Sequence, residues 1–120
     1  MLKPHVKKAW IAALRSGDYQ QGQGSLRRFI YGWDFSRNSQ EVVGYQYCCL
    51  GVLCDIGERK NWEGEAYIFP DGNVDSASIN CNAEMFEMTG LTGYDEAALV
   101  DMNDSGKSFE EIANYIEENL

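Results

Sequence analysis

The sequence predicts a single α+β domain over residues 1–120, in which a small antiparallel sheet packs against a central buried helix and N- and C-terminal amphipathic helices. Three observations support this class. The segment 47–56 is almost continuously apolar. Both ends of the chain carry apolar residues at helical spacing. Between the helical segments lie short β-rich stretches joined by polar or glycine-containing turns.

The central helix is predicted over residues 49–59. Four of its apolar residues recur at positions i, i+3, i+4 and i+7, the pattern of one helix face. These are Cys49, Val52, Leu53 and Ile56. Leu50 and Cys54 fall on the other side, so both faces are apolar. A helix that is apolar all round belongs in the interior of a fold. The run is too short to cross a membrane, which needs ~20 residues.

The terminal helices are predicted over residues 4–16 and from Ser108 to the C-terminus. Pro4 suits a first helical turn, and Gly17 ends that helix. Ser108 and Glu111 have the spacing of a capping box. The apolar stripes of these helices complete the predicted core, which consists of Trp10, Leu14, Cys49, Val52, Leu53, Ile56, Phe109, Ile112 and Ile116.

Two hairpins are predicted between the helices. The first joins strands 25–31 and 41–47 through the polar connection 34–40, and residues 17–24 before it form a glycine-rich loop. The second joins 65–69 and 73–77 around a turn at 70–72. Two short helices follow. One is capped by Asn82 and ended by Gly90 or Gly93, and the other covers 95–102.

Charge is distributed unevenly. The net charge is −9, with +5 in residues 1–40 and −14 in residues 41–120. The simpler interpretation is that the two halves attract each other. The alternatives are that the basic residues converge on an anionic ligand, or that the acidic half repels or mimics nucleic acid. The distribution of apolar residues along the sequence shows neither a signal peptide nor a membrane span, so we expect a cytoplasmic protein with free thiols.

Neither a metal nor a cofactor is expected. The spacing of Cys48, Cys49 and Cys54 differs from the paired cysteines of structural zinc sites. The single histidine, His5, lies in the first helical turn, and Cys–His catalysis is possible only if the fold brings it to a thiol. The sequence shows no recognisable catalytic constellation, which favours a non-enzymatic role.

Residues 20–33 are the strongest candidate for a ligand site. Gly22 and Gly24 would let backbone amides approach a ligand. Two arginines and a lysine could pair with phosphates, and three aromatic residues could stack on a base. The candidate ligand-binding residues are Lys7, Tyr19, Arg27, Arg28, Tyr31 and Trp33. The alternative is a glycine loop that leads into an edge strand protected by arginines.

Three motifs are spread along most of the chain. The first runs from Trp10 to Gly22, the second is Tyr47-Cys48-Cys49-Leu50-Gly51-Val52-Leu53-Cys54-Asp55, and the third runs from Met102-Asn103-Asp104 to Glu117. In these motifs the chain resembles a group of small uncharacterised proteins encoded by bacteriophages and prophages. The resemblance implies a phage or prophage origin and residence in the cytoplasm of the bacterial host.

A local resemblance to helix-turn-helix domains covers residues 98–113. Six acidic residues and one lysine lie between residues 101 and 118, and this excess would repel DNA phosphates. We therefore expect no sequence-specific DNA binding.

The functional expectation is a small accessory protein that binds a host component, most simply a host protein, in counter-defence or host takeover, without enzymatic activity. A first alternative is a nucleotide or signalling-nucleotide binding module or enzyme that uses Arg27 and Arg28. A second alternative is a minor virion component.

Overall fold

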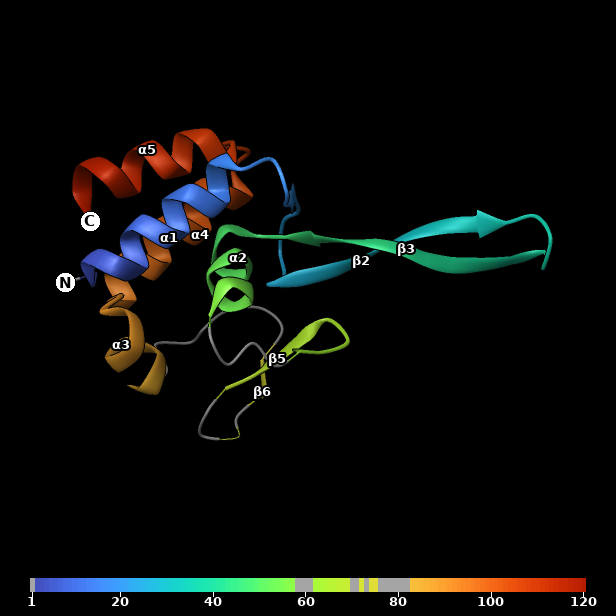
Figure 1. Cartoon of the computed structure of the whole chain (residues 1–120), viewed down its shortest axis with the longest axis horizontal. Coiled ribbons are helices and arrows are strands. Elements are labelled where there is room, and N and C mark those ends of the chain that lie inside the picture. Colours follow the sequence, from blue (N-terminus) through green and yellow to red (C-terminus); the bar gives the residue numbers. More distant parts are fainter. Residues whose placement is uncertain (1, 58–61, 70–71, 73, 76–82) are drawn as a thin grey trace.

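The computed structural model describes residues 2–57, 62–69, 72, 74–75 and 83–120. These residues form five helices and two small sheets, which confirms the predicted α+β class. The helices gather at one end, and a long hairpin extends from them (Figure 1). We call residues 27–47, which form this hairpin, the arm, and the rest of the described chain the body. The molecule measures 50 × 32 × 23 Å.

The helices of the body are α1 (Pro4–Arg15), α2 (Cys49–Ile56), α3 (Ala83–Thr89), α4 (Gly93–Asp104) and α5 (Phe109–Asn119). Helix α1 packs against both α2 and α5. Thr92 caps α4 by accepting a hydrogen bond from the Asp95 backbone N–H, and the predicted capping box at Ser108 and Glu111 is present in α5. These caps fix where α4 and α5 begin.

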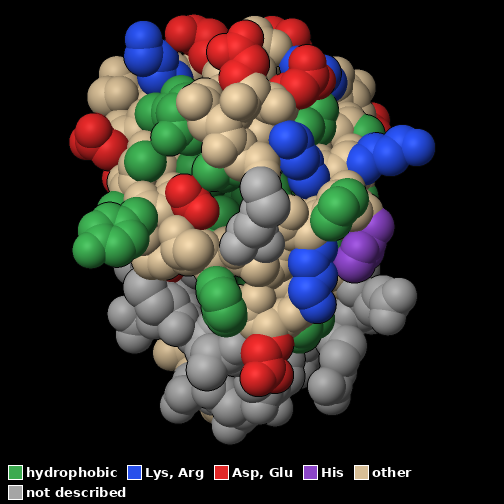
Figure 2. Space-filling view, turned by 90° about the vertical axis from the view of Figure 1, so that its left-hand side faces the viewer, with side chains coloured by type: hydrophobic (Ala, Val, Ile, Leu, Met, Phe, Trp, Pro, Cys, Tyr) green, Lys and Arg blue, Asp and Glu red, His purple; other side chains and the backbone are tan. Residues whose placement is uncertain are grey.

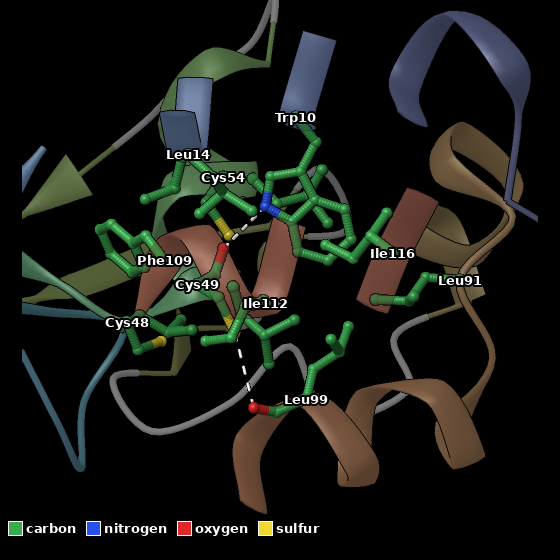
Figure 3. Packing of buried hydrophobic residues seen from close by; sticks show 14 of the residues in the cluster. Trp10, Leu14, Cys48, Cys49, Cys54, Leu91, Leu99, Phe109, Ile112 and Ile116 are labelled. Atoms are coloured by element: carbon green, nitrogen blue, oxygen red, sulfur yellow. Dashed lines mark hydrogen bonds between the residues drawn. The ribbon is translucent and has the colours of Figure 1, made fainter. Parts of the chain in front are cut away.

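Helix α2 lies at the centre of the core. The indole N–H of Trp10 donates to the backbone carbonyl of Cys49 at 2.9 Å, and the Cys49 thiol lies 3.6 Å from the carbonyl of Leu99 (Figure 3). These contacts join α2 to α1 and α4. Of the predicted core residues, Ile56 is half-buried and packs against the cluster. The others are buried, namely Trp10, Leu14, Cys49, Val52, Leu53, Phe109, Ile112 and Ile116.

The first turn of α2 passes very close to the backbone of Leu26. A Cβ atom added to Gly51 would lie 1.7 Å from the Leu26 carbonyl oxygen, which also accepts a hydrogen bond from the Cys48 N–H at 3.2 Å. Only glycine lets helix and loop approach this closely. Gly51 therefore determines how the loop before the arm lies on α2.

A buried amide links three segments beside this contact. Asn103, at the end of α4, is fully buried. Its Nδ2 donates to the Gly22 carbonyl at 2.8 Å, and its Oδ1 accepts from the Cys49 N–H at 3.2 Å and from Gln21 Nε2 at 2.9 Å. Because buried polar groups are costly when unpaired, these bonds hold the three segments in one arrangement.

The first sheet contains β1 (Gln20–Gln21), β2 (Arg27–Asp34) and β3 (Ser39–Tyr47) in the order β1-β3-β2. Strands β2 and β3 are antiparallel with a bulge between Ile30 and Tyr31, whereas β1 is parallel to β3. The predicted first hairpin is confirmed, but its strands extend further toward the tip than the predicted 25–31 and 41–47. The predicted packing of the sheet on α2 applies to the base of the hairpin, because β3 leads directly into α2, while the distal part extends away (Figure 1).

The tip turn of the arm explains the extra length. One carboxylate oxygen of Asp34 accepts hydrogen bonds from the Ser36 N–H at 2.9 Å, the Ser36 hydroxyl at 2.6 Å and the Arg37 N–H at 3.3 Å. Asn38 adopts a positive φ of 52°, which asparagine tolerates better than most residues. This local turn needs only residues 35–38, so both strands continue beyond the predicted connection.

The second sheet contains β4 (Trp62–Glu63), β5 (Ala66–Ile68) and β6 (Val74–Asp75) in that order. The predicted pairing of 65–69 with 73–77 is confirmed for β5 and β6, while β4 was not predicted. Residues 70, 71, 73 and 76–77 of the predicted hairpin and the predicted cap Asn82 lie outside the described residues. The helices predicted around Met85 and over 95–102 are α3 and α4.

None of the helices in the described part of the chain combines the length and the apolar character that a membrane crossing requires.

Replacing Gly51 by alanine should destabilise the fold by more than about 3 kcal/mol, because backbone must move to admit the Cβ atom. Gly44→Ala is the matched control, since its Cβ would lie 3.6 Å from the end of the Ile30 side chain, and it should cost less than about 1 kcal/mol. Urea unfolding followed by circular dichroism measures both. Equal losses for the two variants would contradict the proposed role of Gly51.

Stability should fall in alkaline solution. Burial raises the pKa of the Cys48 thiol to about 11 and raises the pKa values of Cys49 and Cys54 well above the usual 9.0. Above the ordinary thiol pKa of 9.0 the unfolded chain loses its thiol protons, whereas the folded chain keeps them until the pH reaches the raised pKa values. The free energy of unfolding therefore decreases as pH rises above 9.0. Urea unfolding at about pH 8 and about pH 11 measures the loss, which Cys54→Ala should reduce. An unchanged loss in this variant would contradict the assignment.

Candidate functional site

One face of the arm is lined by large apolar side chains. Residues directly opposite each other in an antiparallel pair share a face, and Phe29 lies opposite Tyr45 and Tyr31 opposite Val42. Alternation along β2 places Trp33 on the same side. We call these residues the aromatic face, which consists of Phe29, Tyr31, Trp33, Val42 and Tyr45. Val43 lies on the opposite face, because a Cβ added to Gly32 would meet its side chain at 2.7 Å.

Much of the aromatic face is open to solvent. Tyr31 is 55% exposed, Trp33 50%, Val42 46% and Tyr45 40%, and Phe35 at the tip is 89% exposed. With Val43, these residues make up six of the nine exposed large hydrophobic residues in the described chain. Exposed apolar side chains that gather on one element in this way usually mark an interaction site. The arm is therefore the candidate functional element.

The face of the body turned away from the arm is different. There, Lys and Arg side chains are interspersed with Asp, Glu and hydrophobic side chains, and acidic groups gather toward the end occupied by α5 (Figure 2). Arg15 of α1 pairs with Glu117 at 2.9 Å and Glu110 at 3.6 Å on α5. These ion pairs join a basic segment of the first half to an acidic one of the second half.

A chain of ring contacts connects the arm to the body. Ring centroids are 6.1 Å apart for Tyr31 and Phe29, 5.7 Å for Phe29 and Tyr45, and 6.5 Å for Tyr45 and Tyr47. Tyr47 then meets Trp62 of the second sheet at 6.1 Å. Each such pair contributes roughly 0.5–1.5 kcal/mol beyond its buried area. The base of the arm is thereby packed against the body and not joined to it by a free linker.

Arg27 is part of this packing. Its guanidinium lies 4.1 Å from the ring centroid of Tyr45 and 4.5 Å from that of Trp62. Its Nε and Nη2 both donate to the Gly64 carbonyl, at 3.1 and 2.5 Å. The cation is therefore held between two rings and a backbone oxygen, and it fixes the β4–β5 turn against the base of the arm.

Asp55 of α2 binds residues next to the base of the arm. Its carboxylate accepts hydrogen bonds from the Tyr19 hydroxyl at 2.6 Å and the Trp62 indole N–H at 3.0 Å. Burial, aided by Asp55, raises the pKa of Tyr19 well above its usual value, and the same causes raise the pKa of Tyr47. Both phenols stay protonated at neutral pH, so Tyr19 remains a donor to Asp55.

The structure does not bring the predicted ligand-binding residues together. Arg27 and Arg28 are neighbours in a strand, so their side chains point to opposite faces, and Arg27 is held as described above while Arg28 is exposed. Tyr19 is bound to Asp55. Lys7 lies on α1, beside a shallow hollow shared with α5. Tyr31 and Trp33 belong to the aromatic face of the arm.

Sequence reasoning did not single out Phe29, Phe35, Val42, Val43 and Tyr45 as functional residues. A signal was present, because aromatic residues alternate along 29–33 and again along 45–47. Such alternation normally indicates a strand with one buried face. It could not show that the distal part of this face remains exposed.

A cavity of about 430 Å³ lies between α1, α2 and α3. His5 and Cys54 both line it, together with apolar residues such as Leu53 and Met85. Burial raises the pKa of Cys54 well above the usual thiol value, so the sulfur is neutral near pH 7. The shared cavity brings histidine and thiol into one region, but a neutral, buried thiol is a poor nucleophile.

Among the residues that the structure describes, no three histidine, cysteine or acidic side chains come close enough to share a metal ion.

Arg27 and Arg28 should differ in how much each contributes to the stability of the fold. Arg27→Met removes the ring contacts and both hydrogen bonds to Gly64, and we expect a loss of about 1–2 kcal/mol in the free energy of unfolding. Arg28→Met is the control and should change stability by less than about 0.5 kcal/mol. Chemical denaturation measures both. A larger loss for Arg28→Met than for Arg27→Met would contradict this interpretation.

Comparison with known protein families shows to which family the chain belongs. The family model described as "Domain of unknown function (DUF8296)" matches residues 2–120. No curated protein and no solved structure matches the chain. Since the family model covers almost the whole sequence, from the first turn of the fold to the end of α5, the chain belongs to the DUF8296 family.

Proposed function

We propose that this chain is an accessory factor that binds a partner protein through its arm, without catalysing a reaction. One observation carries the proposal: large apolar side chains are exposed together on a hairpin that extends away from the body (Figure 1). Removing them from water on binding would provide the driving force.

The composition of the aromatic face supports protein binding. Tyrosine and tryptophan are enriched at binding hot spots, since each supplies a large contact area at a small cost in side-chain entropy. The proximal rings and Arg27 hold the base of the arm. Pre-organisation of this kind lowers the entropy cost of association.

Charge indicates the kind of partner surface. The arm carries a net charge of +1, whereas the rest of the sequence carries −10. Arg28 and Arg37 are exposed on the arm, Arg28 on the face opposite the aromatic face. A partner with an apolar groove bordered by acidic groups would pair with the arm and would not repel it. The resemblance to phage-encoded proteins supports a bacterial host protein as this partner, in counter-defence or host takeover.

Affinity capture from bacterial lysate tests the proposal. The tagged chain is compared with a Tyr31→Ser/Trp33→Ser variant, which changes the arm, and with a Phe86→Ser/Tyr94→Ser variant, which removes exposed aromatic residues of the body. We expect a protein identified by mass spectrometry to be captured by the unmodified chain and the body variant. Calorimetry with the purified captured protein should then show that the arm variant binds it at least about tenfold more weakly than the unmodified chain does.

Capture that is unaffected by the arm variant, or lost equally in both variants, would contradict binding through the arm. Detection of the chain in purified phage particles, held there through the arm, would instead favour a virion component as the partner.

A further inference from the structure

We propose that the outer edge of β2 pairs with the same edge of a second copy of the chain, giving an antiparallel dimer with its two-fold axis at Gly32. This inference goes beyond the proposed function and does not depend on it. It rests on which backbone groups of β2 face outward, on the symmetry of the side chains around Gly32, and on the distribution of charge.

Beyond the base of the arm, no strand of the described part of the chain pairs with the outer edge of β2. In the order β1-β3-β2, strand β2 lies at the edge of its sheet. The Phe29 N–H points away from β3, since it donates to the Glu65 carboxylate at 2.8 Å. The bulge between Ile30 and Tyr31 adds its extra residue, Val43, to β3, so the backbone groups of β2 keep alternating between inward and outward. Those of Tyr31 and Trp33 therefore also face outward. Glu65 protects the edge at Phe29, while Tyr31 and Trp33 lie further along the arm.

The aromatic side chains around Gly32 are placed symmetrically. Aromatic residues occupy positions 29, 31, 33 and 35, at equal distances on either side of Gly32. In an antiparallel pair centred on Gly32, Tyr31 lies opposite Trp33 of the second copy, and Trp33 opposite its Tyr31. Residues with outward backbone groups then face each other, so both pairs can exchange N–H···O=C hydrogen bonds. The two aromatic pairs fall on the same face of the combined sheet.

The other face of β2 is also compatible with this pairing. Gly32 meets Gly32 of the second copy on the axis, as a pair without hydrogen bonds, where Cα atoms lie about 4.5 Å apart. Arg28 then lies diagonal to Asp34 of the second copy, which places opposite charges near each other. If the pairing shifted by one residue, outward backbone groups of one copy would lie opposite inward groups of the other and could not bond to them. The register centred on Gly32 is therefore favoured over the registers one residue away.

Charge favours contact through the arms over contact through the bodies. The arm is close to neutral at +1, whereas the rest of each chain carries −10. Antiparallel arms place the two bodies at opposite ends of the assembly, and each molecule is 50 Å long. The two acidic bodies are then further apart than the Debye length of about 8 Å at physiological salt, so they repel each other little.

The two paired arms would form four strands in the order β3-β2-β2-β3, with the aromatic faces of both copies joined into one surface. The paired segment is short, so the interface is smaller than the ~1,600 Å² typical of stable complexes. We therefore expect weak, concentration-dependent association in the micromolar to millimolar range.

Sedimentation equilibrium of the purified full chain tests the association. Trp33→Asp removes both symmetric aromatic pairs and places two carboxylates near the axis, so the dissociation constant should rise at least about tenfold. Tyr94→Asp is the control, because Tyr94 is 89% exposed on α4 of the body, and it should leave the dissociation constant unchanged. A chain that stays monomeric up to millimolar concentration, or equal weakening by both variants, would overturn the proposal.

Disulfide trapping tests the register. A Gly32→Cys/Val43→Ala variant has space for the new side chain and places two thiols on the axis within bridging distance. It should form a covalent dimer under mild oxidation, whereas Gln40→Cys/Val43→Ala, on the other strand of the same arm, should not. Equal cross-linking of both variants would overturn the edge pairing. Since both experiments use the purified chain alone, failure here leaves partner capture from lysate unaffected, and the reverse also holds.

Discussion

The fully buried side-chain amide of Asn103 is the interaction on which the arrangement of the chain depends. It joins the loop at Gly22, the start of α2 at Cys49 and the end of α4. The Leu26 backbone lies against Gly51 beside it, so the chain enters β2 from a fixed position. Loss of this amide would leave buried backbone groups without partners, a cost of roughly 1–3 kcal/mol for each. The position of the arm thus follows from hydrogen bonds made deep inside the body.

The helices could be predicted from sequence because apolar spacing and capping residues are local signals. The buried faces of α1, α2 and α5 follow directly from residues such as Trp10, Val52 and Ile112. Strand limits were less predictable, because the tip turn depends on the side-chain bonds of Asp34. β1 consists of two glutamines, which carry no apolar signal, and it is held by pairing with distant β3. The buried role of Asn103 could not be predicted, because its partners Gly22 and Cys49 are far away in sequence.

The candidate site was predictable only in part. Tyr31 and Trp33 were singled out from sequence, but as partners of the arginines in a ligand site. The ligand site was predicted from glycines, arginines and aromatic residues that are close in sequence, but neighbouring side chains in a strand point to opposite faces. Aromatic residues on alternating positions normally indicate a buried face. Whether such a face is covered depends on where the remaining elements pack, and here the described elements contact the base of the arm and leave its distal side chains exposed.

The junction between arm and body has a mechanical consequence. β3 ends at Tyr47 and α2 begins at Cys49, so a single residue separates the exposed ribbon from the central helix. A lateral force on the tip would therefore act on the first turn of α2, where Gly51 lies directly against the backbone of Leu26. No flexible linker separates the arm from the central helix, so a load on the one would reach the other.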